Sequence, residues 1–231
     1  MIAIHVFGAG GRMGRAIAAA AEGRGDLRLA AAEEADVFVD FSVPDALDAH
    51  LASAVAAGKS ILVGTTGLSG PQQGLIDRAA EKVAVIHAPN TSLGVNLLRH
   101  LVEEAAAKLG PDWDIEIVEM HHRAKRDAPS GTALLLGASA AKGRGSNLEA
   151  LSRFDRMACA EREPGTIGYA VLRGGSVAGE HQVIFAGEGE RIELGHRAES
   201  RAIFARGALA AALWLAGKPA RRYSMADVLG L

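Results

Sequence analysis

The densest set of chemically active side chains lies between residues 119 and 132, where the sequence reads Glu-Met-His-His-Arg-Ala-Lys-Arg-Asp-Ala-Pro-Ser-Gly-Thr. His121 is a candidate proton carrier because an imidazole titrates near neutral pH. Lys125 is a candidate proton donor, since an ammonium among other cations or in apolar surroundings releases its proton more readily. We expect no metal here, because neighbouring histidines point to opposite sides of an extended chain and no further ligand joins them at zinc spacing.

The end of this stretch predicts the start of a helix. Ser130 is a suitable N-cap for a helix beginning near Gly131, and the backbone N–H groups of a first helical turn attract carboxylates or phosphates. His122, Lys125 and the arginines at 123 and 126 add positive charge. A site for a small dianionic substrate at Ser130, Gly131 and Thr132 is one interpretation, and a capped helix beside an ordinary basic loop is the other.

A second candidate site is the glycine-rich turn at residues 7–14, Phe-Gly-Ala-Gly-Gly-Arg-Met-Gly, between a predicted strand and a predicted helix. Glycines there permit a tight turn and let backbone N–H groups approach a pyrophosphate. Gly8 and Gly10 match the first half of the dinucleotide fingerprint, whereas its third position falls on Met13 and Gly14 comes one later. The residues expected to hold a dinucleotide are Gly8, Ala9, Gly10, Gly11, Arg12 and Met13.

The acid that would bind the adenosine ribose is expected about 20 residues further on. Glu33 and Glu34 are both near that place, and a solvated turn is the alternative interpretation. The connection before the next strand is shorter than the dozen residues that a parallel crossover usually needs, so this lobe is trimmed. Because no Arg or Lys follows the glutamates and Asp36 would repel a 2′-phosphate, we expect a preference for NADH over NADPH.

Two further segments follow predicted strands of the same lobe, at the edge where a doubly wound sheet binds its ligand. Gly64, Thr65 and Thr66 come after one strand, and Ala88, Pro89, Asn90 and Thr91 come after the next. Such residues are also common in turns and caps. Their occurrence at two strand ends of one lobe favours a cofactor cleft.

The elements that must position these residues fall into two groups. Strands expected at 2–7, 27–31, 37–41, 60–63 and 83–87 alternate with helices at 12–22, 44–57, 71–81 and 92–109, which is typical of a parallel sheet. After Leu109 the strands expected at 114–120, 168–173, 181–186 and 191–196 alternate apolar and polar residues, as antiparallel strands do. One helix at 132–142 interrupts them, and a helix at 202–216 carries the chain to its end.

The predicted fold is therefore α/β with two domains. Residues 1–92 and 202–231 form a Rossmann-type nucleotide-binding domain with a parallel sheet. Residues 93–201 form an α+β domain for substrate binding and oligomerisation, with a mixed or antiparallel sheet.

Composition narrows the possible functions. The 231 residues include 25 basic and 27 acidic side chains, too balanced for a protein that binds nucleic acid or a membrane surface through charge. Few aromatic residues are present to stack on single-stranded bases. Cys159 is the single cysteine and is expected to be an inert small hydrophobe. No apolar run reaches the roughly 20 residues that cross a bilayer and the N-terminus does not read as a signal peptide, so we expect a cytoplasmic protein.

Taken together, these motifs resemble the dihydrodipicolinate reductases, also called 4-hydroxy-tetrahydrodipicolinate reductases, of bacterial lysine biosynthesis. The resemblance covers nearly the whole chain and is most specific in the double-histidine block. The segments that carry it are 8–14, 39–42, 64–67, 88–91, 121–132, 165–168 and 179–181. The chain is shorter after its second strand than the longer family members.

The resemblance implies hydride transfer from NADH or NADPH to an unsaturated dicarboxylate ring. It implies that His121 is the proton donor and acceptor and that Lys125 is the proton donor. His122, Gly131 and Thr132 would bind substrate, and residues 8–13, 64–66 and 88–91 would hold the cofactor. Family members are typically cytoplasmic homotetramers assembled through the sheets of the second lobe. The alternatives are another NAD(P)-dependent enzyme of this plan, such as an amino-acid dehydrogenase, and a non-catalytic NADH-binding sensor.

Overall fold

The computed structural model describes residues 1–155 and 161–231, so the expectation for Cys159 lies outside the described residues. The chain divides into two compact units. Unit 1 comprises Met1–Leu93 and Arg201–Leu231, and unit 2 comprises Gly94–Ser200. Each is described by itself.

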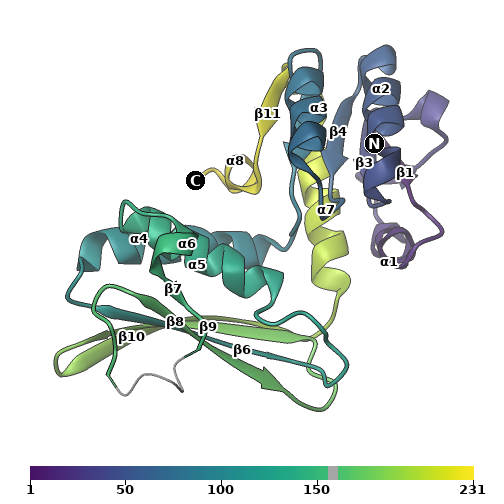
Figure 1. Ribbon diagram of the computed structural model, residues 1–231. Helices are drawn as coiled ribbons and strands as arrows, with labels where there is room; N and C mark the ends of the chain where they lie inside the picture. Colours follow the sequence, from purple (N-terminus) through teal and green to yellow (C-terminus); the bar gives the residue numbers. More distant parts are fainter. Residues whose placement is uncertain (156–160) are drawn as a thin grey trace. The chain divides into compact units, whose positions relative to one another are not determined.

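Unit 1 contains a six-stranded sheet in which every strand pairing is parallel (Figure 1). The strand order is β11-β5-β4-β3-β1-β2. The strands are β1 (Ile2–Phe7), β2 (Leu27–Leu29), β3 (Val37–Asp40), β4 (Ser60–Val63), β5 (Ala84–His87) and β11 (Arg221–Tyr223). The helices are α1 (Arg12–Ala21), α2 (Leu47–Ala57), α3 (Gly70–Ala80), α7 (Ala202–Leu215) and α8 (Met225–Leu229).

Helices cover both faces of this sheet, as parallel sheets require. On one face, Val39 and Leu62 belong to a buried cluster with Ile17 of α1 and Leu209 of α7. On the other, Phe38 of β3 packs in a separate buried cluster with side chains of α2 and α3. Because these strands are buried on both faces, nearly all of their residues are apolar, and such continuous apolar runs made them recognisable in the sequence.

The short connection between β2 and β3 is possible because of the strand register. Ile4 of β1 pairs with Leu29 at the end of β2 and also with Val37 at the start of β3. The chain therefore passes from one side of β1 to the other, through a 3₁₀ turn at Ala32–Glu34, without returning along a strand. A full crossover helix is needed only where such a return is required.

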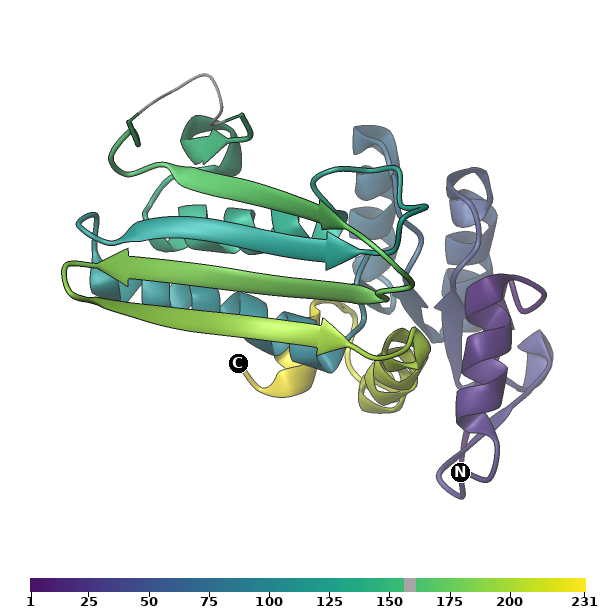
Figure 2. The same ribbon diagram turned by 90° about the horizontal axis from the view of Figure 1, so that it is seen from below.

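Unit 2 is built on a mixed five-stranded sheet of order β10-β9-β6-β8-β7. Its strands are β6 (Asp114–His121), β7 (Ser152–Arg153), β8 (Ile167–Arg173), β9 (Gly179–Gly187) and β10 (Glu190–Ala198). Helices α4 (Leu93–Leu109), α5 (Gly131–Gly143) and α6 (Leu148–Leu151) complete the unit. The helices lie on one face of the sheet, and Figure 2 looks onto the other face.

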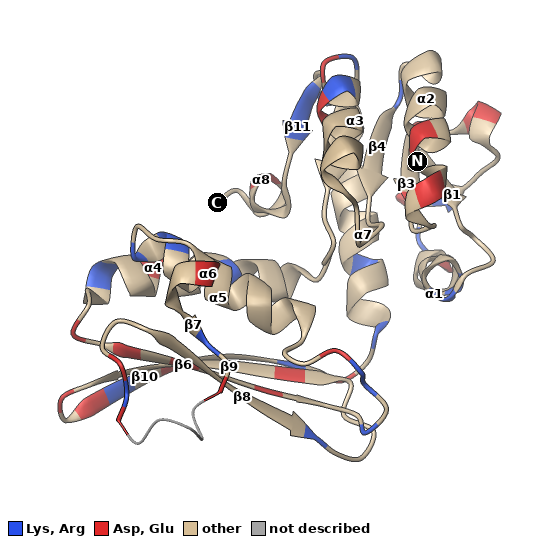
Figure 3. Ribbon diagram, in the orientation of Figure 1, with Lys and Arg blue, Asp and Glu red and all other residues tan. Residues whose placement is uncertain are grey.

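The mixed sheet confirms the fold expected for this domain. The alternation of β8 had indicated an antiparallel strand, but β8 is parallel to β6 because α5 and α6 return the chain between them. The expectation that the chain ends in the helix after residue 202 was wrong, since Gly217 turns the chain with φ +73° into β11 and α8. Among the described residues no helix is both long and apolar enough to span a membrane. Acidic and basic residues are interspersed in both units (Figure 3).

Candidate active site

The glycine-rich turn of unit 1 follows β1 directly and leads into α1. Gly8 has φ +81°, and its carbonyl accepts a hydrogen bond from the Gly11 N–H at 2.9 Å. A Cβ at Gly8 would lie 2.6 Å from the Phe41 carbonyl oxygen, so a side chain is excluded there. At Gly10, by contrast, a Cβ would meet no heavy atom within 4 Å. The turn is closed towards the sheet and open at Gly10.

Gly14 has the packing role that the fingerprint assigns to its third glycine. A Cβ on Gly14 would come within 2.4 Å of the Ala9 backbone and the Gly8 carbonyl. Met13, the residue at the nominal third position, is half-buried and packs against the apolar core of unit 1. The third glycine of the fingerprint is thus displaced by one residue, from position 13 to Gly14, and it still allows α1 to pack closely against the turn after β1.

The other predicted cofactor segments lie after β4 and β5, at the same edge of the sheet. Gly64 packs against Phe41, whose ring a Cβ at Gly64 would overlap, and the Thr65 hydroxyl accepts from the Ser42 N–H at 3.3 Å. Thr66 is exposed. The structure therefore brings the turns after β1, β3 and β4 together.

The segment after β5 is tied to α7. The Ala88 N–H donates to the Val63 carbonyl at 2.9 Å, and the Asn90 side chain accepts from the Ser92 N–H at 3.0 Å. Thr91 is buried and donates its hydroxyl proton to the Phe204 carbonyl at 2.7 Å. Pro89 is exposed between them.

The acidic residues after β2 separate into different surroundings. Glu33 and Glu34 are both exposed on the 3₁₀ turn, and Glu34 is paired with Arg28 at 2.8 Å. The Asp36 carboxylate accepts from the Ala3 N–H at 2.9 Å, near the amino end of β1. Asp36 thus lies at the edge of the sheet opposite to the glycine-rich turn, and its expected repulsion of a 2′-phosphate has no structural basis.

These features fit a dinucleotide. The open space at Gly10 leaves its backbone accessible to a ligand. Gly11 is the N-cap of α1, and no side chain caps the first N–H groups of this helix. Such groups favour a pyrophosphate. Arg12 is exposed beside this turn.

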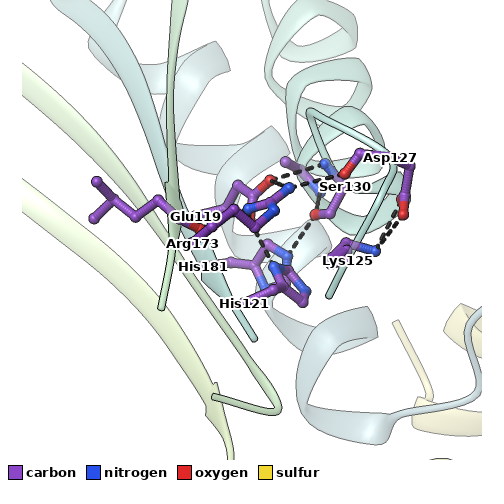
Figure 4. A network of polar contacts seen from close by, with 9 residues as sticks. Glu119, His121, Lys125, Asp127, Ser130, Arg173 and His181 are labelled. Carbon is purple, nitrogen blue, oxygen red and sulfur yellow. Dashed lines mark hydrogen bonds and ion pairs between the residues drawn. The ribbon is translucent and has the colours of Figure 1, made fainter. Parts of the chain in front are cut away.

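The chemical cluster of unit 2 is centred on Glu119 of β6 (Figure 4). The alternation of β6 turns both Glu119 and His121 towards the helices, and their side chains are 1% and 10% exposed. A buried carboxylate is costly unless it is fully hydrogen-bonded. Here Oε2 accepts from His121 Nδ1 at 2.6 Å, Oε1 accepts from the Ser130 N–H at 3.0 Å, and the Arg173 guanidinium donates to both at 2.8 and 2.9 Å.

This arrangement shifts the pKa of both β6 groups. Burial alone would raise the pKa of Glu119, but hydrogen bonds from Arg173, His121 and Ser130 outweigh it and hold the pKa below its usual value. Burial lowers the pKa of His121, and the cations of Lys125 and Arg173 act in the same direction against the raising effect of Glu119. The ground state is an ionised Glu119 beside a neutral imidazole.

Ser130 is buried at the start of α5 and confirms the predicted N-cap. Its hydroxyl oxygen accepts from the Ala133 N–H at 3.1 Å, and the hydroxyl lies 2.8 Å from His181 Nε2. Burial lowers the pKa of His181 to about 4, so its ring is neutral and shares one hydrogen bond with the Ser130 hydroxyl through Nε2. The Ser130 hydroxyl is thus engaged within the protein by the first turn of α5 and by His181.

Lys125 lies in the loop between β6 and α5, and its ammonium donates to both carboxylate oxygens of Asp127 at 2.8 Å. The same loop is attached to the cluster by Arg173, which donates to the Asp127 carbonyl at 2.8 Å. His122 is half-buried just after β6.

Gly131 is exposed, with open space where a Cβ would be, and Thr132 is half-buried in the first turn of α5. Among the described residues no group of three or more His, Cys, Asp or Glu side chains is arranged to hold a metal.

Sequence reasoning missed three members of this cluster. Glu119 was noted only as the start of the motif, Arg173 was not singled out, and His181 was interpreted as strand structure. The signal for Glu119 was present, since a carboxylate at an inward position of an alternating strand needs a cationic or N–H partner.

Both parts of the chain are similar to known proteins. A sequence profile of the dihydrodipicolinate reductase C-terminus matches residues 94–229, and the profile of the N-terminus matches residues 26–91. The 4-hydroxy-tetrahydrodipicolinate reductase of Zymomonas mobilis subsp. mobilis is 56% identical over 249 aligned residues, which cover 100% of this chain and 98% of the relative. That of Caulobacter vibrioides is 47% identical, with 99% and 97% covered.

Among solved structures, the dipicolinate-bound dihydrodipicolinate reductase from a Paenisporosarcina species has a TM-score of 0.79 and 24% identity, covering 98% of both chains. This likeness shows the fold. A parallel sheet with a dinucleotide turn, joined to a mixed-sheet unit that carries a buried acid–imidazole cluster, defines an NAD(P)H-dependent oxidoreductase. The chain belongs to the 4-hydroxy-tetrahydrodipicolinate reductase family.

Proposed function

We propose that this chain reduces the dehydrated form of 4-hydroxy-tetrahydrodipicolinate to tetrahydrodipicolinate with NAD(P)H, in the diaminopimelate route of lysine biosynthesis. The observation that carries the proposal is the His121 imidazole held by a buried carboxylate next to the start of α5, in a chain 56% identical to a reductase of that name. The product requires one hydride and one proton, and a bound nicotinamide supplies the hydride.

The start of α5 is the proposed substrate site. Gly131 and Thr132 occupy its first turn, where backbone N–H groups and the helix dipole favour a carboxylate. The open space at Gly131 leaves room for a ligand to approach the backbone, and His122 supplies a further polar side chain. Ser130 supports this site as the cap of the helix.

Lys125 and His121 are the proposed proton-transfer residues. Electron density added to a conjugated ring with an imine nitrogen is stabilised by a nearby cationic donor. The ammonium of Lys125 is held by Asp127 in the loop just before α5. His121 is a neutral base at rest, suited to restoring or orienting that proton.

For the cofactor, we propose the open turn formed by Gly8, Ala9, Gly10, Gly11, Arg12 and Met13, together with residues 64–66 and 88–91. The exposed Glu33 is the proposed acceptor for the ribose hydroxyls, which favours NADH. The bend at Gly8 and the close packing at Gly14 support this assignment.

The deciding experiment measures oxidation of NADH and of NADPH by the purified chain, with the condensation product of pyruvate and aspartate semialdehyde supplied by a coupled enzyme. We expect substrate-dependent oxidation, with kcat/KM higher for NADH. Oxidation with an amino acid and its oxo-acid partner instead would identify the amino-acid dehydrogenase alternative, and cofactor binding without turnover would identify the sensor.

We also propose that the chain is a cytoplasmic homotetramer assembled through the uncovered face of the unit 2 sheet (Figure 2). That face has a hollow of about 400 Å³ whose lining includes Val118, Met120 and Leu172, and Leu172 is 49% exposed. Exposed apolar patches of this kind commonly mark subunit interfaces. Light scattering should give about four times the chain mass of 23.9 kDa; a monomeric mass contradicts the assembly.

A further inference from the structure

We propose that Glu119, clamped by Arg173, is a positioning residue that fixes the tautomer of His121 and at the same time anchors the start of α5. The inference rests on the proposed function, because it assigns His121 and α5 their parts in the reaction. It concerns two residues that lie 54 positions apart in the chain and meet through the parallel pairing of β6 and β8.

The hydrogen bonds of Glu119 leave one consistent protonation pattern. Both carboxylate oxygens accept from Arg173, and Oε1 also accepts from the Ser130 N–H. Since these partners are donors, the carboxylate must be ionised. Its short contact with His121 therefore requires a proton on Nδ1, and the lone pair of the neutral ring resides on Nε2.

The surroundings of the ring match this assignment. Gly179 begins β9, one residue before Glu180, which pairs with Met120 of β6. A Cβ at Gly179 would lie 3.0 Å from His121 Nε2. The missing side chain keeps space beside the nitrogen that must exchange a proton. The other charged or titratable groups near the ring are Lys125 in the loop, Arg173 of β8 and His181 of β9, whose ring centroid is 5.1 Å away.

The same carboxylate sets the position of the substrate site. Oε1 binds the backbone of Ser130, the residue that caps α5, so Gly131 and Thr132 are held at a fixed distance from the imidazole. Arg173 also fixes the position of the loop between β6 and α5, because it donates to the Asp127 carbonyl. The Asp127 side chain in turn holds Lys125. One ion pair thus places the proton-transfer groups and the helix start together.

If the Glu119–Arg173 ion pair were only structural, it would stabilise the fold but would not fix the tautomer of His121. Glu119→Gln distinguishes this structural role from the positioning role. The new amide NH₂ would face donors at Ser130 and Arg173 if it replaced Oε1. If it replaced Oε2 instead, it would face one donor, Arg173, and it would find an acceptor at His121 Nδ1 once that ring moved its proton to Nε2. The substitution should therefore invert the His121 tautomer.

Imidazole ¹⁵N NMR of the full chain labelled at histidine measures this directly, with His121→Asn used to assign the signal. We expect the Nδ1–H tautomer in the unsubstituted protein and the Nε2–H tautomer in Glu119→Gln. The Nε2–H form in the unsubstituted protein overturns the proposal, without Glu119→Gln having to fold. An unchanged tautomer in the variant does the same.

Kinetics give the second readout. Glu119→Gln should lower kcat by about 100-fold or more, the scale of a lost acid–base group, with KM for the nicotinamide cofactor within twofold. Glu119→Asp, which keeps the charge, should retain the Nδ1–H tautomer and recover part of the rate. Glu104→Gln, at an exposed position of α4, is the matched control and should keep the original kcat.

The two proposals fail separately. If the unsubstituted protein reduces no dihydrodipicolinate-type substrate, the proposed function fails, while the NMR measurement still decides the tautomer. If turnover is present but Glu119→Gln keeps the original kcat and pH profile, the positioning role is refuted and the function stands.

Discussion

At the scale of single residues, the chemistry of His121 depends on one partner close to it in the sequence, Glu119, and on one distant partner, Arg173. His121, Lys125 and the N-cap Ser130 are recognisable within one local motif. What makes His121 a buried neutral base is the carboxylate two residues earlier and a guanidinium from a distant strand. That information resides in tertiary contacts, and no local pattern specifies it.

Lys125 provides the first residue-scale prediction. Lys125→Ala should leave NADH binding within about twofold while lowering kcat at least ~100-fold, because a positioned acid contributes on that scale. Fluorescence titration with NADH and steady-state turnover measure the two effects. Lys108→Ala, at an exposed site on α4, is the control. Turnover equal to that of the control would remove Lys125 from the mechanism.

At the scale of elements, strands were predictable where burial on both faces gave apolar runs, as in β3 and β4. The edge strand β11 was not predicted because its three residues, Arg-Arg-Tyr, form no apolar run, and the first two are exposed. The direction of β8 was missed because alternation reports one wet face and says nothing of strand orientation. The intervening α5 was the available signal for a parallel return.

The packing of α1 on β1 gives a prediction at this scale. Gly14→Ala forces a methyl group to within 2.4 Å of backbone atoms, so it should lower the free energy of unfolding by about 1–3 kcal/mol and weaken NADH binding. Gly10→Ala adds its methyl group in open space and should weaken NADH binding at nearly unchanged stability.

Gly74→Ala, inside α3 with its nearest contact at 3.6 Å, is the helix control and should gain about 0.5–1 kcal/mol. Urea unfolding and NADH titration compare the three variants. Equal stability losses at positions 10 and 14 would show that the close packing of Gly14 is unimportant.

At the scale of the whole molecule, the two-part organisation was visible as a change from apolar runs to alternating strands after Leu109. The sequence analysis assigned residues 202–231 to the nucleotide-binding domain, and Arg201–Leu231 belong to unit 1. The argument that Asp36 would repel the 2′-phosphate of NADPH was wrong, because Asp36 lies at the amino end of β1. Closeness to β2 in the sequence does not show at which edge of the sheet a residue lies. A local sequence pattern predicts helices and strands better than it predicts at which edge of the sheet a loop residue lies.

The buried histidines make a prediction about acid stability of the folded chain. Burial depresses the pKa of His181 from 6.5 to about 4, so the unfolded chain binds a proton in a range where the folded chain does not. This contribution to stability is complete above pH 6.5 and is lost as pH falls towards 4; between pH 7 and pH 5 it amounts to about 2 kcal/mol. Glu119 has a lowered pKa too, but its contribution is lost at a lower pH, around and below the ordinary carboxyl range.

His181→Gln tests this directly, because a glutamine amide can hydrogen-bond to the Ser130 hydroxyl in either direction but does not titrate. The free energy of unfolding, measured in urea at pH 7 and pH 5 at one protein concentration, should fall by about 2 kcal/mol less in the variant. The same substitution at His100, a half-buried position on α4, serves as the control and should follow the unsubstituted protein. If His181→Gln loses as much stability as the unsubstituted chain, the lowered pKa of His181 is not the source of the acid sensitivity.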